Sequence, residues 1–247
     1  MNFSKLFDYS APLVAAATIL VLGAFGVSLY GGKVVTDIKL AEDTIEVTGS
    51  AKRAVTADTG RWTINLETKT GLGDQQAGFD RLGEAVTKIT DYLEAQGMTE
   101  LETPTGNSYA QYAYPQYSEP IHTGYTVSRA VIVRSTDVVK LSTLANDIEP
   151  LTGTDYTVST GMLELTVSSL PDLRVVLLSE AIKDAEARAE AIAKETERSV
   201  GLLRNAEGGV VQVLPEGGVE VSDYGSYDTM SMNKEVMVTV RATFSLE

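Results

Sequence analysis

The residue types that most often carry out catalysis are scarce in this sequence. It contains no cysteine, which excludes disulfides, thiolate chemistry and metal sites with cysteine ligands. Its single histidine, His122, excludes a cluster of histidine ligands and disfavours a histidine general base. We interpret His122 as a histidine of a loop or turn.

Carboxylates are abundant, but those close together in sequence are not spaced for acid–base catalysis. Asp184 and Glu186 are two residues apart in a segment with helical spacing, as are Glu195 and Glu197. Residues two apart on a helix point to different faces, so neither pair can act on one bond. We interpret these four side chains as solvated surface charges.

Two glycine pairs and two aspartates each match only part of a known motif. Gly71-Leu72-Gly73 lacks the third glycine and the strand-to-helix context of a dinucleotide loop, and Gly208-Gly209 lacks the lysine of a phosphate loop. Asp223 and Asp228 lie in a polar loop and could join other oxygens around calcium, although the full calcium-loop pattern is missing. The sequence therefore predicts no enzyme, no cofactor and no metal site. Calcium binding or a hydrolase built on the two aspartates remains an alternative.

The charge balance narrows the classes of partner. Among 247 residues, 34 are acidic and 20 are lysine or arginine, which gives a net charge of −14. Such a chain is repelled by nucleic-acid phosphates and by anionic headgroups, so the sequence predicts no nucleic-acid partner. Its 247 residues are enough for one large domain or two small ones, and its 43% of hydrophobic residues are enough for an ordinary core.

The N-terminal region predicts a membrane anchor. Residues 11–32 contain no charged side chain and are about as long as the ~20 residues that a bilayer-spanning helix needs. We expect residues 1–10 to be cytoplasmic, 11–32 to be a transmembrane signal anchor in the lipid bilayer, and 33–43 to be a short linker. A cleaved signal peptide is the alternative, but the apolar run is long for one and no small-x-small site follows it.

A tyrosine-rich segment predicts an interaction surface. Asn107–Pro120 is nearly uncharged and leads into a strand, which indicates a long hairpin with its tip between Pro115 and Gly124. Exposed tyrosines favour protein interfaces because a rigid ring buries much area at little entropic cost. Stacking of single-stranded nucleic acid would also need basic residues, which this segment lacks. We predict a subunit interface, with ordinary packing within the hairpin as the alternative, and its candidate residues are Tyr109, Tyr112, Tyr114 and Tyr117.

The longest predicted helix carries a stripe of small residues. It starts with Pro171 in its first turn and is expected to end at Gly201. Alanine recurs at every fourth position, which places the small side chains on one face and allows a close approach to whatever packs there. We interpret this stripe as a packing ridge against a sheet, formed by Ala181, Ala185, Ala189 and Ala193.

The remaining patterns predict an α+β fold in which helices cover antiparallel sheets, in the order ββα-ββ-α-β-α-ββ after the transmembrane helix. We expect the first two strands to form a hairpin with its turn near residues 58–60, followed by an amphipathic helix between Asp74 and Gly97. The soluble domain should span 44–247, with possible subdomains 44–150 and 151–247. The other expected elements are a short helix capped by Asp137 and ended by Pro150, a strand at 162–168, a short strand within 208–214 and a last strand at 234–244.

The order of these segments resembles the SIMPL-domain family of bacterial periplasmic and membrane-anchored proteins, which includes periplasmic immunogens and proteins linked to oxidative-stress defence. The similarity spans essentially all of residues 44–247. It is carried by Ile45–Ala51 with Val55–Asp58, by Gly124–Ser128, by the helix Ala181–Ala193 and by the last strand, Val236–Phe244.

This resemblance implies an export-side location and assembly into large ring-like or cage-like homo-oligomers, and it brings no catalytic residues. We therefore expect a single-pass membrane protein of the cell envelope, with its C-terminal domain extracytoplasmic, either periplasmic or at the cell surface. Its expected partners are further copies of itself and the bilayer. The alternative is a stress-protective envelope module that binds a ligand, a cation or a client protein.

Overall fold

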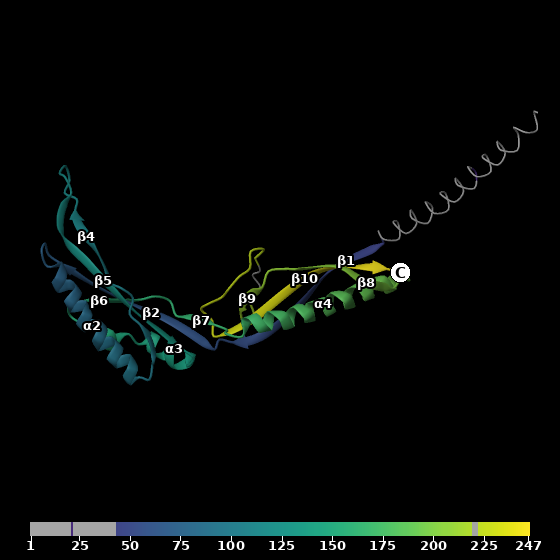
Figure 1. Ribbon diagram of the computed structural model, residues 1–247, viewed down its shortest axis with the longest axis horizontal. Coiled ribbons are helices and arrows are strands. Elements are labelled where there is room, and N and C mark those ends of the chain that lie inside the picture. The colour runs from purple at the N-terminus through teal and green to yellow at the C-terminus, as the bar shows by residue number, and fades with distance from the viewer. Residues whose placement is uncertain (1–20, 22–42, 219–221) are drawn as a thin grey trace, which may run out of the picture. The chain divides into compact units, whose positions relative to one another are not determined.

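The computed structural model describes residue 21 and residues 43–218 and 222–247 (Figure 1). The predicted anchor 11–32 falls outside these residues apart from Val21, as do the N-terminal segment 1–10 and most of the linker. In the part of the chain that is described, no helix combines the length and the apolar character needed to cross a membrane.

The described residues form an α+β fold with two antiparallel sheets and three α-helices, which confirms the predicted class. The order is ββα-βββ-α-ββ-α-βββ, with more strands than expected. In chain order the elements are β1 (Thr44–Thr56), β2 (Thr59–Thr70), α2 (Gln75–Ala95), β3 (Glu100–Glu102), β4 (Asn107–Ala113), β5 (Ile121–Ser135), α3 (Val138–Asn146), the 3-10 helix η1 (Glu149–Leu151), β6 (Thr157–Thr160), β7 (Glu164–Thr166), α4 (Leu170–Glu195), β8 (Val200–Gly208), β9 (Gln212–Pro215) and β10 (Asn233–Leu246).

The strands are divided between a four-stranded and a six-stranded sheet. The first has the order β1-β10-β8, with β9 pairing with β10, and the second has the order β3-β5-β2-β6, with β4 on β5 and β7 on β2. By their contacts the residues fall into two compact units. Among the described residues, one contains residues 43–50 together with Glu180–Gly209 and Val240–Glu247, and the other contains Ala51–Ser179 and 210–239 apart from 219–221. Segments from both sides of residue 150 contribute to each unit.

The expected hairpin of the first two strands is wrong. β1 and β2 belong to different sheets, and the chain passes from one to the other at Ala57 and Asp58. The Ala57 N–H donates to the carbonyl of Met232 at 2.8 Å, and the Asp58 N–H donates to that of Thr166 at 3.0 Å. The Asp58 carboxylate accepts from the backbone N–H and the hydroxyl of Ser168. These bonds to distant parts of the chain replace the turn that a hairpin would need.

The predicted end of the long helix is also wrong. α4 stops at Glu195, six residues before Gly201, and Glu197 just after it adopts a left-handed conformation with φ of 56°. Gly201 instead lies in β8, where a Cβ atom would come within 2.6 Å of the Ser245 hydroxyl oxygen. β8 was missed because nearly all of its residues are exposed and show no alternation.

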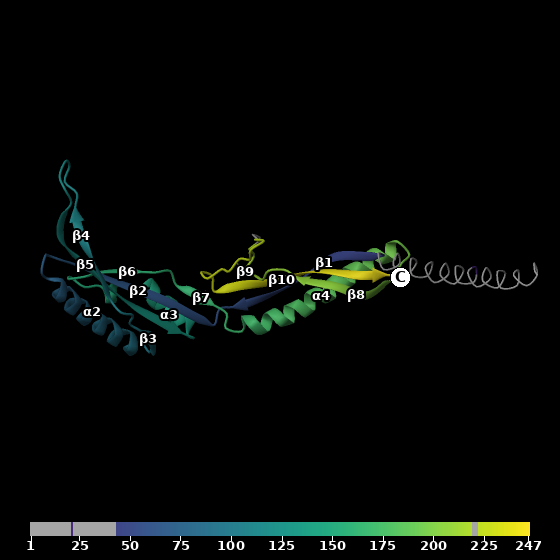
Figure 2. The same ribbon diagram turned by 45° about the horizontal axis from the view of Figure 1, so that its top comes forward.

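The amphipathic pattern of α2 positions the main core. α2 buries its apolar side, including Leu82, Ile89 and Leu93, against the inward side chains of β2 and β5, such as Ile64 and Val131. α2 and α3 lie on this one face of the six-stranded sheet (Figures 1 and 2). The opposite face of β2 is polar, as the alternation in its sequence predicts.

Candidate functional site

The tyrosine-rich segment forms the predicted hairpin of β4 and β5 (Figure 1). The two strands pair antiparallel from Asn107 opposite Ser128 to Ala113 opposite Ile121, with one irregularity between Gln111 and Tyr112. Residues 114–120 form the loop, which is shorter than the predicted tip because β5 already begins at Ile121. Among the described strands, β4 pairs only with β5, so its other edge is open.

All four predicted interface tyrosines are exposed on this hairpin. The exposed fractions are 54% for Tyr109, 50% for Tyr112, 77% for Tyr114 and 97% for Tyr117. No charged residue occurs in the sequence between Glu102 and Glu119. A sheet edge without charge or proline along its strand presents free backbone N–H and C=O groups to another chain. The hairpin therefore combines an aromatic surface with an unprotected edge.

His122 supports the base of this surface. Its ring lies 5.2 Å from that of Tyr112 and 4.9 Å, edge to face, from that of Tyr125. Its Nε2 is 2.9 Å from the carbonyl oxygen of Gly124, and because a carbonyl can only accept, this nitrogen carries the proton. The interpretation of His122 as a loop or turn histidine is wrong, because it lies in β5 opposite Tyr112, where its contacts stabilise the hairpin.

The alanine ridge is buried inside the fold. Ala181, Ala185 and Ala189 are fully buried and Ala193 is 2% exposed. Gly49 of β1 lies so close that a Cβ atom there would be 2.1 Å from the Ala181 carbonyl oxygen. These residues thus pack backbone against backbone, which leaves no room for a ligand.

The acidic pairs considered for catalysis are not brought together as reactive groups. Asp184 accepts hydrogen bonds from the Ser50 N–H and from Arg188 Nε, both at 2.8 Å, so its carboxylate is committed to structure. Glu186 is exposed. In the residues described, no three potential metal ligands of the His, Cys, Asp and Glu types gather at one place.

Asp228 is committed as well, to a buried lysine. Lys234 has a fully buried side chain, and its Nζ donates to the Asp228 carbonyl at 2.6 Å and to Asp228 Oδ2 at 3.3 Å. The carboxylate also accepts from the backbone N–H groups of Met230 and Ser231. Asp223 is exposed and takes no part. The Asp228 carboxylate is therefore engaged within the fold, in a contact that does not include Asp223.

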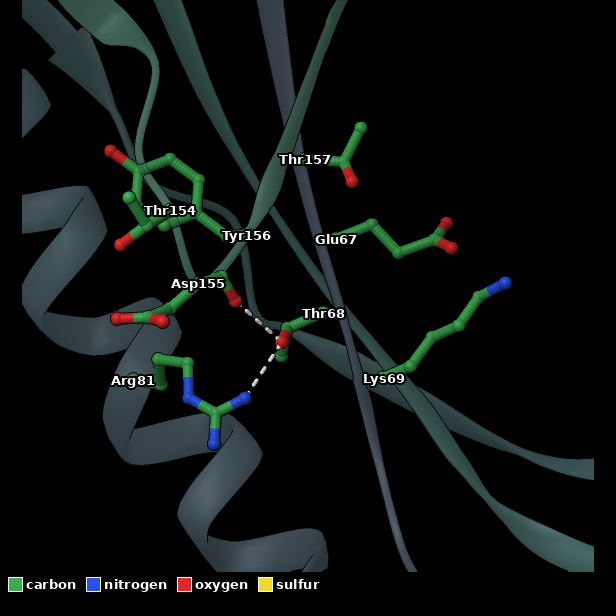
Figure 3. Close-up of a pocket in the computed structure, with 8 residues that line it drawn as sticks. All are labelled: Glu67, Thr68, Lys69, Arg81, Thr154, Asp155, Tyr156 and Thr157. Carbon is green, nitrogen blue, oxygen red and sulfur yellow. Dashed lines mark hydrogen bonds between the residues drawn. The ribbon is translucent and has the colours of Figure 1, made fainter.

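A polar cleft of 470 Å³ lies beside the six-stranded sheet, and sequence reasoning did not find it. It forms where β6 begins and the edge of β2 beyond Glu67 is no longer paired with β6, with α2 on one side (Figure 3). The loop before β6 forms one wall. Tyr156 fixes this loop, because its hydroxyl donates a hydrogen bond to the Leu151 carbonyl at 3.1 Å. Burial also raises the pKa of the Tyr156 phenol, so this hydroxyl keeps its proton. The lining residues are Glu67, Thr68, Lys69, Arg81, Thr154, Asp155, Tyr156 and Thr157.

A scan against protein families matches residues 45–244 to SIMPL, described as a protein of unknown function (DUF541). This match covers the described fold and confirms the resemblance seen in the sequence. A comparison with curated proteins finds no match.

Proposed function

Since this chain belongs to the SIMPL family, whose description assigns no activity, we propose its function from its own surface: a non-catalytic protein of the cell envelope that assembles with copies of itself. The contact is made by the hairpin of β4 and β5. Residues 11–32 anchor each copy in a membrane, and the SIMPL domain lies on the extracytoplasmic side. The assembly is a ring-like or cage-like homo-oligomer.

The observation that carries this proposal is the exposure of four tyrosines on an uncharged hairpin whose β4 edge is open in the described residues. Rigid aromatic side chains contribute large contact areas at low entropic cost, and they are enriched at interfaces. Backbone groups along β4 can pair with a strand of another copy. Because each copy carries a net charge of −14, an uncharged contact is where two copies repel each other least.

The test is the mass of the full-length protein extracted in mild detergent. At micromolar concentration we expect a homo-oligomer, measured by light scattering with the detergent contribution subtracted. Replacing the four hairpin tyrosines by serine should reduce the mass to that of a monomer. Tyr224→Ser is the matched control, because Tyr224 is 96% exposed outside the hairpin and should leave the mass unchanged.

Two outcomes would contradict the proposal. One is a wild-type protein that is monomeric at micromolar concentration, and the other is a hairpin variant that assembles as well as Tyr224→Ser. The double variant Tyr114→Ser/Tyr117→Ser changes only the loop and leaves the ring contact of Tyr112 with His122 in place. It therefore separates loss of the interface from loss of the hairpin fold.

The second candidate function is a ligand-binding envelope module linked to stress protection, which the polar cleft favours. The cleft lies within the 300–1,000 Å³ range typical of small-molecule sites, although it is more polar than most. Binding at the cleft and assembly through the hairpin use different residues, so one protein can do both.

A further inference from the structure

Arg81 is a half-buried cation of the polar cleft with a neutral partner. Its NH1 donates to the Thr68 hydroxyl oxygen at 3.1 Å, and Thr68 is only 5% exposed. The same hydroxyl donates its single proton to the Asp155 carbonyl at 2.8 Å, so it can face Arg81 only as an acceptor. One N–H thus holds the guanidinium in place, and its other N–H groups are available to a ligand in the cleft (Figure 3).

Two arginines of the six-stranded sheet pair with acids, unlike Arg81 of α2. Arg61 lies 3.3 Å from Glu164, and Arg134 bonds to Glu102. In the described part of the chain, no carboxylate oxygen lies within 4.0 Å of a guanidinium nitrogen of Arg81, so Arg81 has no ion pair there. A half-buried guanidinium that lacks a carboxylate is a ready site for one from outside, since guanidinium binds carboxylates with two parallel hydrogen bonds.

The cleft carries charges of both signs, with the carboxylates of Asp155 and Glu67 in the same lining as Arg81 and Lys69. Figure 3 shows the side chains of Arg81 and Asp155 on the same side of Thr68, both lining the cleft and not paired with each other. A phosphate would be attracted by Arg81 but repelled by the Asp155 carboxylate. A molecule with a carboxylate and an ammonium group satisfies both charges at once.

We propose that this cleft binds a small zwitterion of the amino-acid class, with its carboxylate on Arg81 and its ammonium on Asp155. The free edge of β2 beyond Glu67 and the hydroxyls of Thr154 and Thr157 supply the remaining polar contacts. Thr68 is a positioning residue, since it fixes Arg81 and the Asp155 backbone through a single oxygen. The inference goes beyond self-assembly and does not depend on it.

The test is titration of the full-length protein in detergent with a panel of free amino acids at millimolar concentrations, followed by calorimetry. Acetate, methylammonium and inorganic phosphate are titrated in parallel. At least one amino acid should bind saturably, with acetate and methylammonium each weaker by about tenfold or more. Arg81→Gln and Asp155→Asn should each weaken amino-acid binding by about tenfold or more.

Arg241→Gln is the matched control, because it removes one positive charge at an exposed ion pair with Glu46 and should leave the affinity unchanged. Arg81→Lys keeps the charge but loses the forked geometry, and should bind more weakly than wild type. Unchanged unfolding temperatures ensure that each variant is folded. Three results would overturn the proposal: no saturable binding of any amino acid, phosphate bound as tightly as the amino acid, or Arg81→Gln equal to Arg241→Gln. None of them bears on the oligomer mass, so self-assembly stands or fails separately.

Discussion

At the scale of single residues, the pair of Asp228 and Lys234 shows what holds the polar loop to the last strand. Lys234 occupies an inward position of β10, in register with Val236 and Val238, and its side chain is fully buried. A buried ammonium is stable only with a counter-charge and hydrogen-bond acceptors, and Asp228 provides both. A lysine within an alternating apolar pattern was the sequence signal for this pair. We made no prediction from this signal, and the pattern alone does not identify the acid that meets the lysine.

The pH dependence of stability follows from this pair. Burial raises the pKa of the Asp228 carboxyl, but hydrogen bonds from Met230, Ser231 and Lys234 outweigh burial and leave the pKa below its ordinary value of 3.8. Because the folded state has the lower pKa, the stabilisation is fully present above the unfolded value and is lost as the pH falls through the folded one. We therefore expect Asp228→Asn to cost about 3 kcal/mol at neutral pH and progressively less as the solution becomes more acidic.

Urea unfolding of both proteins, from neutral pH to below pH 3.8, measures this difference directly. Asp223→Asn is the control, since Asp223 is exposed and should behave as wild type at every pH. Asp58 adds a second acid-sensitive contact, because the Ser168 hydroxyl bond outweighs burial and lowers the pKa of its carboxyl. A constant gap between wild type and Asp228→Asn across the pH range would show that the carboxylate charge is not what stabilises the loop.

At the scale of elements, the close contact of α4 with β1 depends on the absence of a side chain at position 49. A Cβ atom on Gly49 would lie 2.1 Å from the Ala181 carbonyl oxygen and 2.5 Å from the Ala185 amide nitrogen. Both are backbone atoms of a helix, so they cannot rotate away. Gly49→Ala should therefore destabilise the fold by about 1–3 kcal/mol, as overpacking does.

The matched control is Gly83→Ala in α2, where a Cβ atom would meet only the end of the Arg129 side chain, at 3.6 Å. Alanine has the higher helix propensity, so this change should stabilise by about 0.5–1 kcal/mol. Both free energies come from urea unfolding followed by circular dichroism. If Gly49→Ala is as stable as wild type, the helix and the strand do not pack as closely as described.

The sequence predicted elements better than it predicted their partners. The helical spacing of α2, the cap of α3 by Asp137 and the alternation of β10 each follow from local patterns, and the structure confirms them. The pairing of β1 and β2 was wrong because alternation identifies a strand but not its neighbour, which here is decided by bonds from residues 57–58 to distant segments.

The same limit separates the two candidate sites. The tyrosine hairpin is contiguous in sequence, so its composition and its turn residues were enough to predict an exposed hairpin. The cleft depends on Thr68 meeting Asp155, which is 87 residues away. Arg81 has the sequence context of an ordinary surface residue on an amphipathic helix. Only the fold brings these groups together.

At the scale of the whole molecule, the net charge of −14 opposes every association between copies. Salt screens this repulsion, with a Debye length that falls from ~10 Å at 0.1 M to ~3 Å at 1 M. A contact made by ion pairs would weaken in salt, whereas one made by tyrosines and backbone hydrogen bonds has no attractive charge to lose.

Raising sodium chloride from about 0.05 M to about 0.5 M should therefore shift the full-length protein toward the oligomer, as measured by light scattering at constant detergent. The four-serine hairpin variant should remain monomeric throughout, because screening removes a repulsion and supplies no contact. Dissociation of the wild-type oligomer by salt would instead indicate that charged residues, and not the hairpin, hold the copies together.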